Sequence, residues 1–401
     1  MTEPVVYATT PSTHRTMGLS IHYAPCIAAT ATNASGGTGD LSDLVESYQH
    51  QHSANNGFDT AQIVIKGQWK WIENWWFEGL ARDIQVFNPD LNTVWRGFVN
   101  SVSLSVGPLS AARGPLTDVA TYAFTVYTRI LDDTVNPPIV GSQTVTTAAT
   151  DPDSIARYGQ WEKVLSGGTV IKDTAERYRD THIAENHNPP SSELLNFGAS
   201  TEVQLTIDCL GYWAWLQAYT YSDATAGTRT ISTKLQDILT SDPNGIFSTN
   251  YAHIETNSYL ASREESDYPS ALTVIQAETA IGDIYDNRFT FGIWEDQVAR
   301  YREVSTLKTQ YEHFLTDDKM RVATFGGGTE VPYWNVRADE WLFIADFLEG
   351  QAPDTVNRRD DDRFIFIERV NYTMPDGLSI NGMRIGNLAQ FLAKQGLGGT
   401  A

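Results

Sequence analysis

The stretches Asp151-Pro-Asp-Ser-Ile-Ala-Arg-Tyr-Gly159 and Lys172-Asp-Thr-Ala-Glu-Arg-Tyr-Arg-Asp180 indicate how this chain is organised. The first is predicted to open with a turn at its Asp-Pro pair and to continue into a polar strand edge over 157–159. Gly167-Gly168 then leads into a short amphipathic helix that ends at Asn188-Pro189-Pro190, because proline does not continue a helix. No reactive residue pattern occurs here, so the segment is interpreted as a connector between two β-rich domains.

The sequence on both sides of the connector alternates apolar and polar side chains, which is typical of half-buried strands. Strands are predicted over 58–65, 83–87, 93–99, 101–106, 119–130, 202–209, 289–294, 297–304, 319–324, 340–344 and 364–372. Helical spacing predicts helices over 69–81, 231–239, 271–282 with Ser270 as N-cap, and 388–395. Residues 41–48 are expected to form a short helix or a loop edge, and 211–221 fit either a helix or a strand.

The size and composition describe a folded protein of the α+β class, mainly β. The 401 residues are 41% hydrophobic and 11% aromatic, enough for packed cores. Residues 1 to about 17 are expected to form an N-terminal arm, and 29–40 a flexible loop. The predicted organisation is 1–150 for the arm and first β domain, 151–262 for the connector helix and second β-rich domain, and 263–401 for a C-terminal α+β segment.

The charge balance argues against static binding to nucleic acid or to an anionic membrane. The formal net charge is −21, and the closest approach to a basic run, Arg358-Arg359, is followed directly by Asp360-Asp361-Asp362. An acidic surface instead repels DNA, which suits a wall past which DNA slides.

Cysteine content and hydropathy bear on the compartment. Cys26 and Cys209 belong to no CxxC motif and cannot staple a fold of this size, so folding in a reducing, intracellular compartment is expected. The N-terminus shows no secretory signal, and the longest apolar runs, such as 341–345, are too short to cross a bilayer. A soluble protein without a membrane anchor is expected.

Two histidine pairs are the first candidates for a metal site. His182 and His187 lie at i and i+5, whereas a helical zinc site needs i and i+4 on one face. Five residues rotate a side chain by about 500° around a helix, so this pair is interpreted as a solvated helix end. His50 and His52 alternate with Gln and are able to share one strand face, but no metal is expected there either.

Other candidate catalytic groups also have simple structural interpretations. Glu264-Glu265, Asp317-Asp318 and Asp360-Asp361-Asp362 are acid pairs of the kind that arise by chance in a chain with 49 Asp and Glu. No Gly-x-Ser-x-Gly elbow occurs. Cys209 lies mid-strand and is expected to be a buried thiol, and Gly326-Gly327-Gly328 is expected to form a hairpin tip because no helix or lysine follows it. No catalytic, cofactor or metal residue is assigned.

Aromatic residues cluster at 69–77 and 212–221. Such clusters serve as sugar-stacking platforms, or they fill a core or a subunit interface. The helical spacing within 69–77 favours burial.

Several segments, in matching order along the chain from about residue 58, resemble the tail-hub (baseplate hub or tail tip) proteins of tailed bacteriophages. They are Val94-Trp-Arg-Gly-Phe-Val-Asn100, Ser154-Ile-Ala-Arg-Tyr-Gly159, Gly282-Asp-Ile-Tyr-Asp286, Val331-Pro-Tyr-Trp-Asn-Val-Arg-Ala-Asp339, Phe366-Ile-Glu368 and Leu388-Ala-Gln-Phe-Leu-Ala-Lys-Gln-Gly396. The connector likewise resembles the stretch that joins the two barrel-like domains of those proteins.

The resemblance implies two barrel-like β domains with inserted helices and a homotrimer whose six such domains form a pseudo-sixfold ring. The ring would join a tail tube or distal tail protein to a spike or fibre protein around the DNA exit channel. It would be assembled in the host cytoplasm and reside in the virion tail. No catalytic residues and no cofactor are implied, and the C-terminal segment is either a separate domain or completes the barrels.

Two other functions stay open at the level of sequence. A carbohydrate-binding, receptor-binding β-protein of the tail would expose Trp or Tyr side chains along a groove. A secreted hydrolase would need a signal peptide or a convergent carboxylate pair, and the sequence shows neither.

Overall fold

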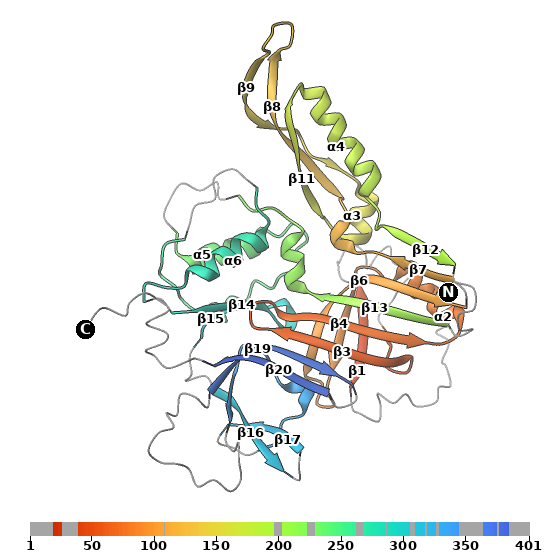
Figure 1. The fold of residues 1–401 in the computed structure, drawn as a ribbon, viewed down its shortest axis with the longest axis vertical. Coiled ribbons are helices and arrows are strands. Elements are labelled where there is room, and N and C mark those ends of the chain that lie inside the picture. Colours follow the sequence, from red (N-terminus) through yellow and green to blue (C-terminus); the bar gives the residue numbers. More distant parts are fainter. Residues whose placement is uncertain are drawn as a thin grey trace.

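The alternating segments pair into one large sheet in the computed structural model (Figure 1). The structure describes residues 19–25, 39–107, 109–195, 203–222, 229–261, 268–285, 287–304, 309–316, 319–325, 329–344, 364–374 and 377–384. The predicted N-terminal arm, most of the loop over 29–40 and the helix over 388–395 lie outside these residues. The mainly-β, α+β class is confirmed.

The main path of the sheet runs in the order β17-β16-β18-β19-β3-β4-β13-β6-β5-β1-β2. These strands are β17 Lys319–Thr324, β16 Thr309–Thr316, β18 Trp341–Ile344, β19 Phe364–Thr373, β3 Val45–Ser53, β4 Gly57–Lys66, β13 Val203–Gly211, β6 Thr93–Val106, β5 Arg82–Phe87, β1 Ser20–Pro25 and β2 Gly39–Asp40. Within the part of the chain that the structure describes, this path is open at both ends and no closed barrel is seen.

Further strands join the main path at its sides. β7 Leu109–Arg113 pairs with β6 and with β12 Ser191–Leu195, β14 Phe289–Ile293 pairs with β15 Ala299–Glu303 and touches β4, and β20 Gly377–Arg384 pairs with β19. The pairing draws on distant sequence, since Tyr372 lies opposite His50 and Cys209 lies opposite Ala61. Strands from all three predicted domain segments thus share one sheet, and the domain boundaries themselves stay a prediction.

Aromatic side chains fill the main core where the sheet meets a 3-10 turn. Phe98 of β6 packs edge-on against Trp215, with the ring centroids 4.9 Å apart, and Trp161 lies 5.0 Å from the same indole. The body also contains three helices, α2 Trp69–Glu78, α5 Ile231–Thr240 and α6 Ala271–Ile281, and the 3-10 turns η2 Leu116–Asp118, η3 Tyr212–Gln217, η4 Glu295–Gln297 and η6 Tyr333–Asn335, among the described residues. Residues 211–221, predicted as helix or strand, therefore contain a 3-10 turn.

A separate four-stranded sheet projects from the body of the protein (Figure 1). This projection contains β8 Tyr122–Asp132, β9 Ile139–Val145, β10 Ala149–Thr150, α3 Pro152–Tyr158, β11 Glu162–Val170 and α4 Lys172–Asn186. β11 runs parallel to β8, with a bulge between Ser166 and Gly168, and α4 packs against β8 and β11. The predicted connector therefore contributes α3, β11 and α4 to a folded unit whose other strands, β8, β9 and β10, precede it in the chain.

Three predictions of local structure were wrong at least in part. Residues 157 and 158 of the predicted strand edge belong to helix α3, and Gly159 is its C-cap. The helix starts here because the Asp151 carboxylate accepts the backbone N–H of Ser154 at 2.8 Å and Pro152 occupies the first helical turn. Of residues 41–48, predicted as a short helix or a loop edge, 41–44 do form a turn, but 45–48 belong to strand β3, Val45–Ser53, between β4 and β19. The strands over 93–99 and 101–106 are one continuous strand, β6, whose residues from Gly97 to Val106 pair with β13.

The prediction that Ser270 caps the helix over 271–282 is confirmed, since its side chain accepts the backbone N–H of Thr273 at the start of α6. Thr230 caps α5 in the same way, which was not predicted. Gly57 begins β4 with φ 81° and leaves no space for a Cβ atom, which would lie 2.1 Å from the carbonyl oxygen of Ile293.

Candidate functional site

The tip of the projection, residues 130–140, exposes apolar side chains. Leu131 is 59% exposed and Ile139 is 52% exposed, and both lie where β8 and β9 meet. The core of the projection is small, consisting of Ala120, Ala123, Leu165 and Ile183. It lies near the base, so the tip has no core of its own to bury these side chains. Contiguous exposed apolar side chains commonly mark interaction surfaces.

Hydrogen bonds hold the base of the projection against the body. The Glu162 carboxylate accepts the backbone N–H and the hydroxyl of Thr220, each at 2.8 Å, and the Glu162 N–H donates to the carbonyl oxygen of Ala218 at 2.7 Å. Trp161 is buried beside Trp215. The projection is thus anchored through the first residues of β11, and its tip is held away from the body.

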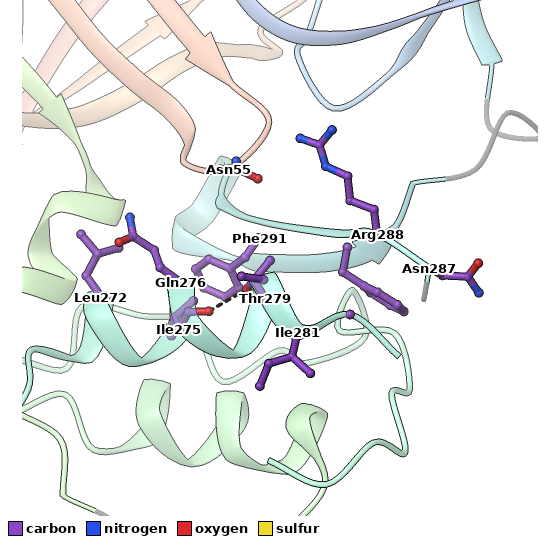
Figure 2. Close-up of a pocket in the computed structure, with 12 residues that line it drawn as sticks. Asn55, Leu272, Ile275, Gln276, Thr279, Ile281, Asn287, Arg288 and Phe291 are labelled. Carbon is purple, nitrogen blue, oxygen red and sulfur yellow. Dashed lines mark hydrogen bonds between the residues drawn. The ribbon is translucent and has the colours of Figure 1, made fainter. Parts of the chain in front are cut away.

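A pocket of about 680 Å³ lies between α6 and the start of β14 (Figure 2). Its floor is apolar, made by Leu272, Ile275, Phe289 and Phe291. The figure shows Asn55 and Arg288 on the side opposite α6, which contributes Gln276, Thr279 and Ile281. A pocket of this size with an apolar floor and a few polar groups is a suitable binding site.

Arg288 is the only charged side chain lining this pocket among the described residues. Its guanidinium lies 3.2 Å from the carboxylate of Glu368 and over the ring of Phe366. It is partly exposed, so it remains accessible at the rim of the pocket.

An arginine–carboxylate network joins β15 to the segment before β18. Arg302 contacts the carboxylate of Asp339 and lies 2.8 Å from Glu340, and the Thr290 hydroxyl donates to Asp339 at 2.5 Å. Arg337 contacts Glu295, which also pairs with Arg300. Burial raises the pKa of Asp339 to about 6.

This network is able to stabilise the packing of the C-terminal segment but offers no obvious catalytic pair. Each of its carboxylates already accepts a guanidinium, and Arg337 also donates to the carbonyl oxygen of Thr93 at 3.2 Å. Asp339 adopts φ 68°, a left-handed conformation that is uncommon outside glycine and is held here by its contacts with Arg302 and Thr290. Sequence reasoning missed this network because its members are far apart in the chain.

The His50–His52 pair lies on one face of β3, as the alternation predicted. The two rings stack with centroids 4.7 Å apart, and both side chains are buried. His52 Nε2 donates to the carbonyl oxygen of Val94 at 3.0 Å, whereas neither ring nitrogen of His50 has a hydrogen-bond partner among the described residues. Burial lowers the pKa of His50 to about 3 and the pKa of His52 well below its usual value. Both imidazoles are therefore neutral at pH 7.

The other histidines of interest stabilise the end of α4. His187 Nδ1 donates to the carbonyl oxygens of Ile183 and Ala184 at 3.1 and 3.0 Å, and Asn186 donates to the carbonyl oxygen of His182. Across the residues that the structure covers, no three His, Cys, Asp or Glu side chains gather to hold a metal ion. The acid pairs at 264–265, 317–318 and 360–362 and the glycines at 326–328 lie outside the described residues.

The described residues of the two aromatic clusters are mainly buried, and so is Cys209. Trp75 and Trp76 face the core while Phe77 is 52% exposed, and Tyr212 and Trp215 are fully buried. These positions favour the core interpretation over a sugar-stacking platform. Cys209 is a buried free thiol, and burial raises its pKa.

In the described parts of the chain, no helix is long and apolar enough to cross a membrane.

Comparisons with known proteins include a distant match to a solved structure. No protein-family description matches the chain, and no curated protein matches it in sequence. Among solved structures, the tail protein from Neisseria meningitidis MC58 is similar over 90% of this chain and 94% of that chain, with a TM-score of 0.38 and 8% sequence identity.

Proposed function

We propose that this protein is a structural subunit of a phage tail tip or baseplate hub. In this proposal three copies close into a ring that joins the tail tube or distal tail protein to a spike or fibre protein. The ring surrounds the DNA exit channel. The observation that carries the proposal is the projection, whose anchored base and exposed apolar tip suit a subunit that is completed by its neighbours.

The positions of the motifs that resemble tail-hub proteins support a structural role. Trp95 and Phe98, from the motif in β6, are fully buried in the core. The motif at 154–159 forms most of α3 at the base of the projection. Arg337 and Asp339, from the motif at 331–339, belong to the arginine–carboxylate network. These residues stabilise the fold and contribute no reactive group, so we propose that the protein is not an enzyme.

The negative charge supports a role beside DNA without binding it. A net charge of −21 repels the phosphate backbone, so an acidic channel wall would let DNA pass without adhering. This part of the proposal predicts that a map of the assembled ring by electron microscopy will place acidic side chains on the inner wall. A basic lumen would contradict it.

Mass measurement of the purified chain in solution tests the proposal directly. Light scattering coupled to size-exclusion chromatography is expected to give three times the chain mass of 44.5 kDa, and negative-stain images are expected to show rings. A monomer at micromolar concentration that binds glycans on an array would overturn the hub proposal in favour of the carbohydrate-binding alternative.

A further inference from the structure

We propose that the pocket between α6 and the start of β14 binds the C-terminal tail of the same chain, residues 385–401, through the apolar face of the helix predicted over 388–395. The tail lies outside the described residues. The contact is made within one copy, so it goes beyond the proposed function and does not depend on the number of copies. It rests on where the described chain ends, on the lining of the pocket and on the spacing and charge of the tail.

The described chain ends beside the pocket. β20 is the last described strand, and its final residue, Arg384, lies opposite Ile365 of β19. Phe366, the next residue of β19, has its ring centroid 5.6 Å from the guanidinium carbon of Arg288, which lines the pocket. Residues 385–387 separate Arg384 from the predicted helix, and four residue steps extend to about 14 Å at most. The tail therefore starts within reach of the pocket.

The lining of the pocket suits an apolar, uncharged occupant. Ile275 and Phe289 belong to its apolar floor, and Ile281 lines it while 40% exposed. Arg288 is the only charged side chain in the lining among the described residues, and its charge is already balanced by the carboxylate of Glu368, 3.2 Å away. The pocket therefore offers apolar surface and no uncompensated charge.

The spacing of the tail provides a matching apolar face. Leu388, Phe391 and Leu392 stand at i, i+3 and i+4, so a helix places all three side chains on one side. An apolar helix face of this kind binds in an apolar groove, with these positions as the anchors. Docking removes the three side chains and the pocket floor from water, and it ties the end of β20 to α6.

The charge of the tail distinguishes it from the rest of the chain. Residues 385–401 contain Lys394 and no acidic residue, whereas the whole chain has a net charge of −21. The tail is therefore attracted to the body of the protein and brings no carboxylate into the pocket. Residues 345–363, which connect β18 to β19 outside the described residues, contain six acidic residues. Desolvating such charges is costly, so this segment is a poorer occupant.

Hydrogen exchange of the full-length chain, followed by mass spectrometry, tests the contact. The amides of residues 388–395 are expected to exchange at least about tenfold more slowly than in a synthetic peptide of residues 386–397. Ile281→Lys, which places a charge in the pocket, is expected to abolish this protection, and so is Phe391→Ser, which leaves the pocket unchanged. Ile284→Lys, the same change at a 58% exposed position outside the pocket lining, is the matched control and is expected to keep the protection.

Cysteine cross-linking in the full-length chain locates the bound tail. In a Cys26→Ser background, Gln276→Cys combined with Leu392→Cys is expected to form a disulfide within one chain, because Gln276 is exposed and lines the pocket. The yield is expected to stay the same on dilution. Glu73→Cys combined with Leu392→Cys is the control, at an exposed position on α2, and is expected to form none.

The outcomes separate this inference from the proposed function. Amides of residues 388–395 that exchange as fast as those of the free peptide overturn the inference, and so does protection that survives Ile281→Lys. A disulfide between positions 276 and 392 that forms only between chains also overturns it and assigns the pocket to the tail of a second copy. A monomeric wild type that shows the protection and the disulfide within one chain supports the inference and overturns the hub proposal.

Discussion

Replacing the buried His50 with leucine is expected to make this protein less sensitive to acid. His50 is packed against His52 and Tyr372, with ring centroids 4.7 and 5.1 Å away, and its side chain is 3% exposed. Burial lowers its pKa to about 3, compared with 6.5 for an exposed histidine. The folded state therefore stays unprotonated at pH values where the unfolded chain binds a proton.

The sign and size of the effect follow from this difference in proton binding. Stability is independent of His50 ionisation well above pH 6.5, and it falls as the pH drops through 6.5 toward 3, because only the unfolded state gains a proton. Between pH 7 and pH 5 the loss from His50 alone is about 2 kcal/mol. His52 acts in the same direction, since burial also lowers its pKa.

Urea unfolding followed by tryptophan fluorescence, at pH 5, 6, 7 and 8 and one protein concentration, measures this dependence. Between pH 7 and pH 5, His50→Leu is expected to lose about 2 kcal/mol less unfolding free energy than the wild type loses. At pH 7 the variant is expected to be at least as stable as the wild type, because an imidazole without hydrogen bonds is replaced by an apolar side chain. His253→Leu, at an exposed position, is the control. An identical pH dependence in His50→Leu and the wild type would refute the reasoning.

Three further predictions concern buried and exposed contacts. Lys234→Met removes the cation that lies 2.7 Å from the buried carboxylate of Glu278. Urea unfolding at pH 7 should show a loss of about 3 kcal/mol in the free energy of unfolding, and adding Glu278→Leu should restore most of it. A further loss in the double variant would contradict this. Arg302→Met removes the cation beside the carboxylates of Asp339 and Glu340, so it should lower the melting temperature more than Arg302→Lys, which keeps the charge. Equal melting temperatures of the two variants would show that the charge of residue 302 is unimportant for stability. Trp75→Ala should lower the free energy of unfolding in urea by about 3 kcal/mol or more. Phe77→Ala, on the exposed side of α2, should lower it by less than about 0.5 kcal/mol. Similar losses in the two variants would refute the described packing of α2.

Local patterns predicted the elements whose cause is local. α5 was found because apolar side chains recur at helical spacing, and α6 because Ser270 caps its start. β4 and β13 were found because side chains alternate along most of each strand. The signal for α3 was also local, an Asp-Pro-Asp-Ser start with the cap at Asp151, and it was wrongly interpreted as a turn.

The candidate surfaces could be predicted only in part. His50 and His52 were placed on one strand face by their alternation, but their burial depends on β19, more than 300 residues away in sequence. Arg302 and Asp339 meet only because β15 lies beside the segment before β18. The exposure of Leu131 does not follow from its strand, since the same alternation buries side chains in the body of the protein.

The sequence by itself determined the class of this protein, its acidic charge and the local start of most helices and strands, because these depend on composition and on neighbours within a few residues. Only the tertiary structure decided that β6 is one strand, that the connector folds as a projection, and that a pocket forms beside Arg288. The physical reason is that strand pairing and burial are set by partners distant in the chain, and an apolar side chain is core or interface according to what the folded chain places against it.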